Sequence, residues 1–197
     1  MSPAPPDVWR FIFANGRPVE IEIGPGRGDV LFAFADQAPE VNFYAVEIGR
    51  SQTEHLTERA RALGLRNVCV IAGDARCVVT RLVPTATVAA YHVYFPDPWP
   101  KTRHRHRRLF RPDFADGLRR TLVPGGRVHV ASDLAWLFAH MDATLAGAGF
   151  VADPSAPARS RPVTPFERKY GRDGVHARTY LCGAEGTATP QRPQKTS

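Results

Sequence analysis

The sequence has few cysteines and no long apolar run. Its three cysteines, Cys69, Cys77 and Cys182, are too few and too scattered for a disulfide framework or a zinc site, so we expect no structural metal. No stretch approaches the ~20 apolar residues that a membrane-spanning helix needs. The first seven residues, MSPAPPD, lack the basic and apolar regions of a signal peptide. We therefore expect a cytoplasmic protein with no membrane partner.

Acidic residues are missing from residues 101–111, where much of the positive charge is concentrated. The chain has 26 Lys and Arg against 19 Asp and Glu, a formal net charge of +7. The run contains Lys101, Arg103, His104, Arg105, His106, Arg107, Arg108 and Arg111. A helix-free loop with this charge favours a polyanionic partner, because neutralising phosphates releases their counterions. A solvated basic loop is the alternative, and the flanking arginines make the two histidines unattractive to a metal cation.

Strand-like and helix-like segments alternate along the chain. The predicted strands are 19–23, 42–46, 68–71, 87–95, 127–131 and 177–182, and the predicted helices are 29–38, 51–63, 78–82, 112–122 and 134–146. Such repeats predict an α/β fold with a doubly wound, mostly parallel sheet and helices on both faces. We assign residues 1–18 to a short N-terminal segment, 19–183 to one domain and 184–197 to a disordered tail.

An acidic residue stands at or near the carboxyl end of five predicted strands. These residues are Glu22, Glu47, Asp74, Asp97 and Asp133. In doubly wound sheets the ligand binds outside the carboxyl ends of the strands. We therefore expect the five carboxylates, which come from separate strands, to converge on one shared pocket at that edge of the sheet.

A glycine-rich loop follows the first predicted strand. Gly24, Gly26 and Gly28 let the backbone approach a ligand closely and turn N–H groups towards it. The spacing is not the dinucleotide fingerprint, whose third glycine comes one residue later, and it lacks the lysine of a P-loop. The loop alone is therefore only a weak indication of a nucleotide-like ligand.

Three of the strand-end acids indicate which nucleotide-like ligand would bind beside the glycine loop. Glu47 stands where a ribose is gripped through its hydroxyls, with an exposed strand-end glutamate as the alternative. Asp74 is placed to accept a hydrogen bond from an adenine amino group or to cap a helix. Glu22 lies beside the glycine loop, where it would face a cationic end of the ligand. So many carboxylates would repel a pyrophosphate, which favours S-adenosylmethionine over NAD.

Three motifs, taken together, resemble the tRNA (guanine-N(7)-)-methyltransferase family over residues 9–182. They are EIGPGRG at 22–28, FPDPWPK at 95–101 with the basic run 103–108, and TPFE at 164–167. The proline-bracketed Asp97 and its basic run are the most specific part, whereas most class I methyltransferases share the glycine loop. Pro165 departs from the family, which often has a basic residue at that position.

The resemblance implies a Rossmann-like class I methyltransferase fold, S-adenosylmethionine as methyl donor, and a guanine in the variable loop of tRNA as acceptor. The cofactor-side residues are then Glu22, Glu47, Asp74 and Asp97 with Gly24, Gly26 and Gly28, and Asp97 is also the catalytic residue. The substrate contacts are Lys101, Asp133, Thr164, Pro165, Phe166 and Glu167. The RNA-binding residues are Arg103, His104, Arg105, His106, Arg107 and Arg108. We expect a monomer or homodimer that binds tRNA.

Several of these residues have a structural alternative. Trp99 and Phe166 would stack on an extruded base or pack in the core. Asp133 would contact the substrate or cap the following helix. His92 would touch the ligand or be a satisfied buried histidine. The rival functions are a methyltransferase of another RNA guanine or of a small molecule, and a catalytically silent RNA-binding relative.

Overall fold

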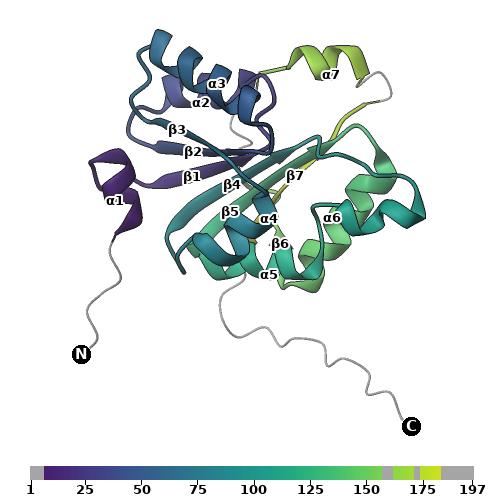
Figure 1. Ribbon diagram of the computed structural model, residues 1–197. Helices are drawn as coiled ribbons and strands as arrows, with labels where there is room; N and C mark the ends of the chain where they lie inside the picture. Colours follow the sequence, from purple (N-terminus) through teal and green to yellow (C-terminus); the bar gives the residue numbers. More distant parts are fainter. Residues whose placement is uncertain (1–6, 157–161, 171–173, 183–197) are drawn as a thin grey trace, which may run out of the picture.

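The computed structural model describes residues 7–156, 162–170 and 174–182, which form one sheet covered by helices on both faces (Figure 1). The strands are β1 (Val19–Ile23), β2 (Asn42–Glu47), β3 (Val68–Ala72), β4 (Val88–Tyr94), β5 (Leu122–Ser132), β6 (Phe150–Ala152) and β7 (His176–Cys182). Their order is β3-β2-β1-β4-β5-β7-β6. Strands β1 to β5 pair in parallel, and β7 is antiparallel to both β5 and β6. The predicted doubly wound, mostly parallel α/β fold is confirmed.

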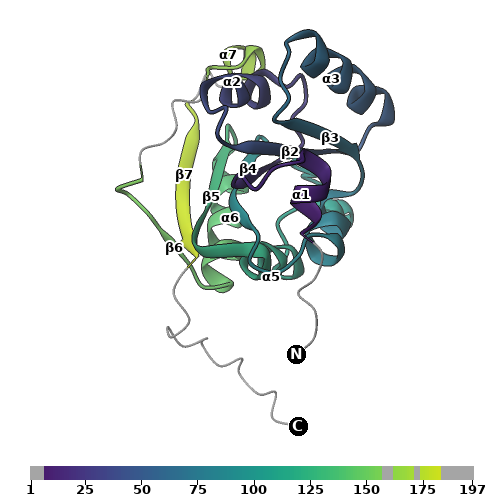
Figure 2. The ribbon, with the colours of Figure 1, turned by 90° about the vertical axis from the view of Figure 1, so that its left-hand side faces the viewer.

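The helices divide between the two sides of the sheet. Helices α2 (Asp29–Gln37), α3 (Arg50–Ala62) and α7 (Pro165–Tyr170) lie on one side, and α4 (Ala75–Cys77), α5 (Pro112–Thr121) and α6 (Ala135–Gly147) lie on the other (Figures 1 and 2). Helix α1 (Val8–Phe13) packs through Trp9 on the same core as α5 and α6, and the Trp9 ring meets that of Tyr44 edge-on at 5.1 Å. A π-helical turn, η1 (Val78–Leu82), continues α4, and a 3-10 helix, η2 (Thr102–Arg107), follows β4.

Each face of the sheet buries its own core, and together the two cores fix the strand register. Phe34 and Leu56 belong to the core under α2 and α3, whereas Phe114 and Met141 belong to the core on the opposite face. Successive residues of a strand point to opposite faces, so a slip of one residue would expose every buried side chain. The register therefore holds the carboxyl ends of the parallel strands along one edge.

The strand order places a topological switch point between β1 and β4. From β1 the chain winds outwards through β2 to β3, and it returns to pair β4 on the other side of β1. Helices that follow these strands leave the sheet on opposite faces, so a crevice opens at the carboxyl ends of β1 and β4. Ligands of doubly wound sheets bind in such a crevice.

The structure corrects two predicted boundaries. Strand β5 begins at Leu122 and not at Arg127, because the strand runs without a break through Pro124, Gly125 and Gly126. Gly125 there has a φ of +75°, and the pairing with β4 shifts between Val88 and Ala90. The basic run, predicted as a helix-free loop, instead winds into the 3-10 helix η2.

Besides η2, four short elements were not predicted, namely α1, α4, β6 and α7, because they are too short to show a periodicity. The capping residues of α1 and α7 are nevertheless visible in the sequence. Asp7 caps α1, since its carboxylate accepts from the Arg10 N–H at 3.2 Å. The Thr164 hydroxyl accepts from the Glu167 N–H at 3.1 Å at the start of α7. The predicted tail at 184–197 lies outside the described residues.

Membrane-spanning helices and metal-binding clusters are both absent from the described part of the chain. Within residues 7–156, 162–170 and 174–182, no helix has the length and apolar character to cross a membrane. Among the same residues, no three side chains of His, Cys, Asp or Glu gather closely enough to hold a metal ion.

Candidate active site

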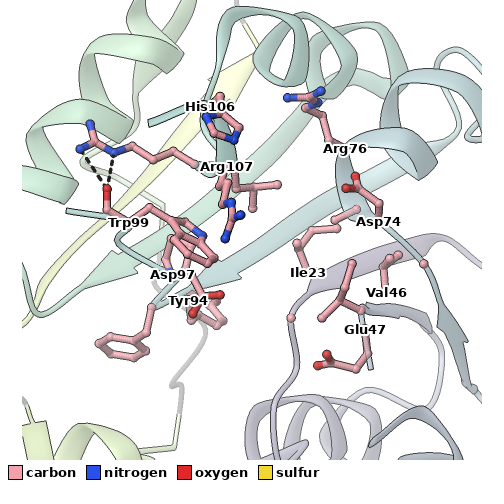
Figure 3. Close-up of a pocket in the computed structure, with 18 residues that line it drawn as sticks. Ile23, Val46, Glu47, Asp74, Arg76, Tyr94, Asp97, Trp99, His106 and Arg107 are labelled. Carbon is pink, nitrogen blue, oxygen red and sulfur yellow. Dashed lines mark hydrogen bonds between the residues drawn. The ribbon is translucent and has the colours of Figure 1, made fainter. Parts of the chain in front are cut away.

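A cavity of about 640 Å³ opens at the carboxyl ends of β1 to β4, at the switch point of the sheet (Figure 3). Its walls come from the residues that follow each strand: Gly24 after β1, Glu47 at the end of β2, Asp74 after β3, and the loop after β4. The end of η2 closes one further side. Figure 3 shows Glu47 and Asp74 at one side of the cavity and Asp97 with Trp99 at the other.

The glycine loop adopts a backbone conformation that other residues disfavour. The φ angle is +65° at Gly24, +55° at Gly26 and +76° at Gly28. A Cβ atom at Gly24 or Gly26 would point into open space, whereas one at Gly28 would lie 2.5 Å from a ring carbon of Phe32 and 2.7 Å from a methyl carbon of Leu56. Gly24, which lines the cavity, thus leaves room for a ligand, whereas Gly26 and Gly28 lie outside the cavity wall and Gly28 lets α2 pack.

Side chains from α3 hold the glycine loop in place. The Gln52 amide donates to the Gly26 carbonyl at 2.5 Å, and the Arg59 guanidinium donates to the Arg27 carbonyl at 2.8 Å. The same guanidinium lies 4.9 Å above the centre of the Phe32 ring. The loop therefore has a fixed shape that a ligand does not need to induce.

We predict that Gly28→Ala destabilises the fold by about 2–4 kcal/mol, because the added methyl group must overpack Phe32 and Leu56 and also accept a positive φ. Gly24→Ala is the matched control. It has a similar φ and meets no neighbour, so we expect a loss of only about 1 kcal/mol. Denaturant unfolding of both variants measures the difference. Equal losses would attribute the effect to φ alone and contradict the packing role.

Three of the predicted acids line the cavity together, but two also have local partners. Glu47 accepts from the Gly49 N–H at 3.2 Å through Oε1. Asp74 is the N-cap of α4, and its Oδ1 accepts from the Cys77 N–H at 2.9 Å. Asp97 lies exposed on the loop after β4. The helix-capping alternative for Asp74 is therefore confirmed, and the same side chain also lines the cavity.

The other two strand-end acids lie outside the cavity walls. Glu22 is buried, and because side chains alternate along β1 it faces the core under α2, whereas Ile23 and Gly24 line the cavity. Asp133 is half-buried and follows β5. Its helix-capping alternative is wrong, since the N-cap of α6 is Leu134 and no described side chain makes a capping hydrogen bond there.

The loop after β4 holds Asp97 between two residues with strained backbones. Phe95 has a φ of +52° and Trp99 a φ of +40°, in the left-handed region that side chains with a Cβ disfavour. Prolines on both sides of Asp97 restrict the loop further. Strain of this kind is retained at sites where a side chain must be held in one place.

Trp99 is held in the cavity wall by cationic and aromatic neighbours. The Arg107 guanidinium lies 4.8 Å over the indole centre, and the His104 ring meets the indole edge-on at 5.7 Å. Arg108 donates two hydrogen bonds to the Trp99 carbonyl, at 3.3 and 3.2 Å, drawn as dashed lines in Figure 3. Trp99 belongs to neither core, so the core-packing alternative for it is wrong.

The basic run has a cavity-facing part and a solvent-facing part. The cavity is lined by His106, Arg107 and Arg108, whereas Arg103 and Arg105 are exposed outside it. Lys101 is also exposed at the start of η2. The 3-10 helix turns some of these side chains towards the cavity and others towards solvent. The sequence-based prediction of a helix-free loop did not include this division.

The C-terminal motif lies at the start of α7. Thr164 caps this helix, and Pro165 is its first residue and is exposed. Among the described side chains, Thr164, Pro165 and Glu167 are not part of the cavity wall. The prediction for the Phe166 side chain lies outside the described residues.

Several cavity residues were missed in the sequence, among them Ile48, Tyr94 and Arg76. Ile48 is 74% exposed and follows the strand-end Glu47, so its position next to that acid is the signal that it lines the site. Tyr94 ends β4 just before the Asp97 loop. Arg76 contacts Asp113, with Nε and Oδ2 3.4 Å apart, and this pairing across α4 and α5 has no signal in the sequence.

Comparisons with known proteins agree on one family. Residues 16–178 match the family described as "Putative methyltransferase". The tRNA (guanine-N(7)-)-methyltransferase of Nitrosococcus oceani is 40% identical over 156 residues, which cover 78% of this chain and 66% of that protein. This chain therefore spans just under two thirds of the length of that relative. The enzyme of the same name from Myxococcus xanthus is 36% identical over 181 residues, covering 92% of this chain and 85% of that protein.

Solved structures share the fold at lower sequence identity. The 16S rRNA methyltransferase KamB matches with a TM-score of 0.65 at 21% identity, covering 89% of this chain and 93% of that chain. A variant of the 16S rRNA (adenine(1408)-N(1))-methyltransferase from Catenulisporales acidiphilia, solved with cosubstrate SAM, matches with a TM-score of 0.65 at 16% identity, covering 93% and 94%. At these identities the likeness establishes the class I methyltransferase fold alone.

Proposed function

This chain belongs to the tRNA (guanine-N(7)-)-methyltransferase family, and from that premise we propose that it transfers the methyl group of S-adenosylmethionine to N7 of a guanine in tRNA. The observation that carries the proposal is the cavity whose wall Glu47, Asp74 and Asp97 share with the cavity-facing end of η2. This arrangement places carboxylates for a cationic cofactor next to a basic surface for a polyanion.

The residues present fit the proposed methyl donor. Gly24 adjoins open space at the cavity wall, as close approach of a nucleoside or its amino acid end requires. Glu47 would accept from ribose hydroxyls, and Asp74, which uses Oδ1 to cap α4, would accept an adenine amino group at Oδ2. Val46 and Ile48 supply apolar wall beside them. When bound, S-adenosylmethionine supplies a methyl group on a cationic sulfur.

Asp97 would stabilise the charge that the reaction creates on the acceptor. Guanine N7 carries a free lone pair, so no base has to remove a proton before attack. The bond from N7 to the methyl carbon forms as the bond from sulfur to that carbon breaks, and the positive charge moves to the guanine ring. A carboxylate fixed beside the base stabilises this charge, and it can also accept from the N–H edge of the ring.

The remaining predicted residues would bind the RNA. We propose that Lys101, Asp133 and residues 164–167 contact the substrate and that Arg103 and Arg105 bind phosphates near the cavity. A guanine inside a stack cannot reach the donor, so we expect it to be extruded, here from the variable loop. One face of the Trp99 indole is covered by Arg107, so a base that stacks on Trp99 uses the other face or displaces the guanidinium.

The test is a methyl-transfer assay with purified protein, radiolabelled S-adenosylmethionine and unmodified tRNA, followed by nucleoside mapping. We expect label in N7-methylguanosine at one position of tRNA. Label in ribosomal RNA or in another nucleoside would redirect the assignment to a different RNA. An absence of transfer in a single-turnover reaction, with donor binding intact, would identify a catalytically silent relative.

We predict that Glu47→Ala weakens binding of the product S-adenosylhomocysteine about tenfold or more, because the ribose hydroxyls lose their acceptor. The fold should be unaffected, since among the described residues this carboxylate accepts only from the local Gly49 N–H. Calorimetric titration gives the dissociation constant. Glu58→Ala on the exposed part of α3 is the control, and an unchanged affinity in Glu47→Ala would remove Glu47 from the site.

A further inference from the structure

A chain of buried hydrogen bonds reaches the cavity wall from inside the protein. None of the residues in this hydrogen-bonded chain has a role in the proposed methyl transfer. The Glu20 Oε2 lies 2.7 Å from His92 Nε2, and His92 Nδ1 lies 2.9 Å from the Tyr94 hydroxyl oxygen. Glu20 is 8% exposed and His92 1%, whereas Tyr94 lines the cavity. A buried carboxylate is thereby connected to the ligand site through one imidazole.

Neighbouring rings fix the orientation of that imidazole. The His129 ring of the next strand stacks on His92 with centres 4.9 Å apart and planes 8° from parallel. The Phe34 ring of α2 meets the His92 ring edge-on at 5.2 Å. His129 is itself held through Nδ1, which lies 2.9 Å from the Thr179 hydroxyl. A ring packed in this way cannot turn to offer its nitrogens elsewhere.

The partners of His92 determine the direction of each hydrogen bond. A carboxylate can only accept, so Nε2 of the ring carries the hydrogen and donates it to Glu20. When the imidazole is neutral, Nδ1 is the acceptor and the Tyr94 hydroxyl donates to it. A phenol oxygen that donates its proton in this way can still accept a hydrogen bond.

The strand register places Tyr94 beside the glycine loop. Ile23 of β1 pairs with Val93 of β4, so Tyr94 lies opposite Gly24 across the switch point. Alternation along each strand puts Tyr94 on the same face as Glu22, which pairs with His92. An oriented acceptor near a carboxylate, at the mouth of a glycine loop, suits a cationic N–H donor.

We propose that Tyr94 accepts a hydrogen bond from the ammonium group at the amino acid end of the methyl donor, and that Glu20 and His92 are positioning residues that orient its hydroxyl. The inference rests on the proposed function, since it assigns one end of the same cofactor. The Tyr94 hydroxyl would then bind the cofactor together with the strand-end acids, and buried hydrogen bonds through His92 would fix its orientation.

The test compares two ligands that differ only in the amino acid end, which includes the ammonium group of the proposed contact. S-adenosylhomocysteine carries the amino acid end, whereas 5′-methylthioadenosine lacks it. We expect Tyr94→Phe to weaken S-adenosylhomocysteine about tenfold and to leave 5′-methylthioadenosine within about twofold, as loss of a hydrogen bond to a charged group implies. His92→Leu should reproduce this pattern, and His92→Gln, which keeps a donor and an acceptor, should restore most of the affinity.

Tyr91→Phe is the matched control. Tyr91 lies in the same strand and also loses a hydroxyl hydrogen bond, to Thr121 at 2.7 Å, but on the opposite face. Its binding of both ligands should be unchanged. Equal losses for both ligands in Tyr94→Phe, or no loss for either, would overturn the inference even if His92→Leu fails to fold. If the unaltered protein binds neither ligand, the proposed function fails as well.

Discussion

Replacing Asp97 by Asn is expected to lower the rate of methyl transfer to tRNA about 100- to 1000-fold while the protein stays folded. The amide keeps the size of the side chain but removes the negative charge that would stabilise the cationic guanine in the transition state. The loop that carries Asp97 is held by its prolines and by the Arg108 hydrogen bonds to Trp99, none of which involves the carboxylate. Single-turnover rates at saturating donor and tRNA measure the effect.

The affinity for S-adenosylhomocysteine separates the two roles assigned to Asp97. A loss of rate with a dissociation constant within about threefold indicates a group that acts in the transition state. A fall in affinity with an unchanged rate at saturating donor would leave Asp97 with a cofactor-binding role only. Asp116→Asn is the matched control, because Asp116 is an exposed aspartate on α5, outside the cavity wall.

The strand-end acids could be predicted because the topology of a parallel sheet forces their convergence. Once β1 to β4 are parallel, residues that follow each strand meet at one edge, whatever the details of packing. That argument succeeds for Glu47, Asp74 and Asp97, which share the cavity. The argument fails for Glu22, because the direction of a side chain within a strand depends on alternation, which turns Glu22 towards α2.

Contacts between strands could not be predicted, since they depend on register. A shift of β4 by one residue against β1 would turn His92 and Tyr94 to the other face and remove the contact with Glu20. The sequence therefore supports a satisfied buried histidine at His92, which the structure confirms, but not the identity of its partners. The capping of α4 by Asp74 and of α7 by Thr164 shows a further limit, because a cap and a ligand contact use the same residue types.

The solvent-facing part of the basic run is expected to supply much of the affinity for tRNA. Reversing Arg103 and Arg105 to Glu together should weaken tRNA binding about 100-fold, since two phosphate contacts are lost and two repulsive charges are added. Both residues are exposed and lie outside the cavity wall, so S-adenosylhomocysteine should bind as before. Filter binding over a range of salt concentrations should show the slope of log affinity against log salt reduced by about 2.

The same reversal at Arg61 and Arg66 controls for net charge. These arginines are exposed near the end of α3 and before β3, at the edge of the sheet away from the cavity. The change in overall charge is identical, so the long-range attraction of the protein for RNA falls equally in both variants. If the two double variants lose tRNA affinity to the same extent, the basic run acts only through net charge. A loss confined to Arg103 and Arg105 places the RNA contact beside the cavity, where an extruded guanine must enter.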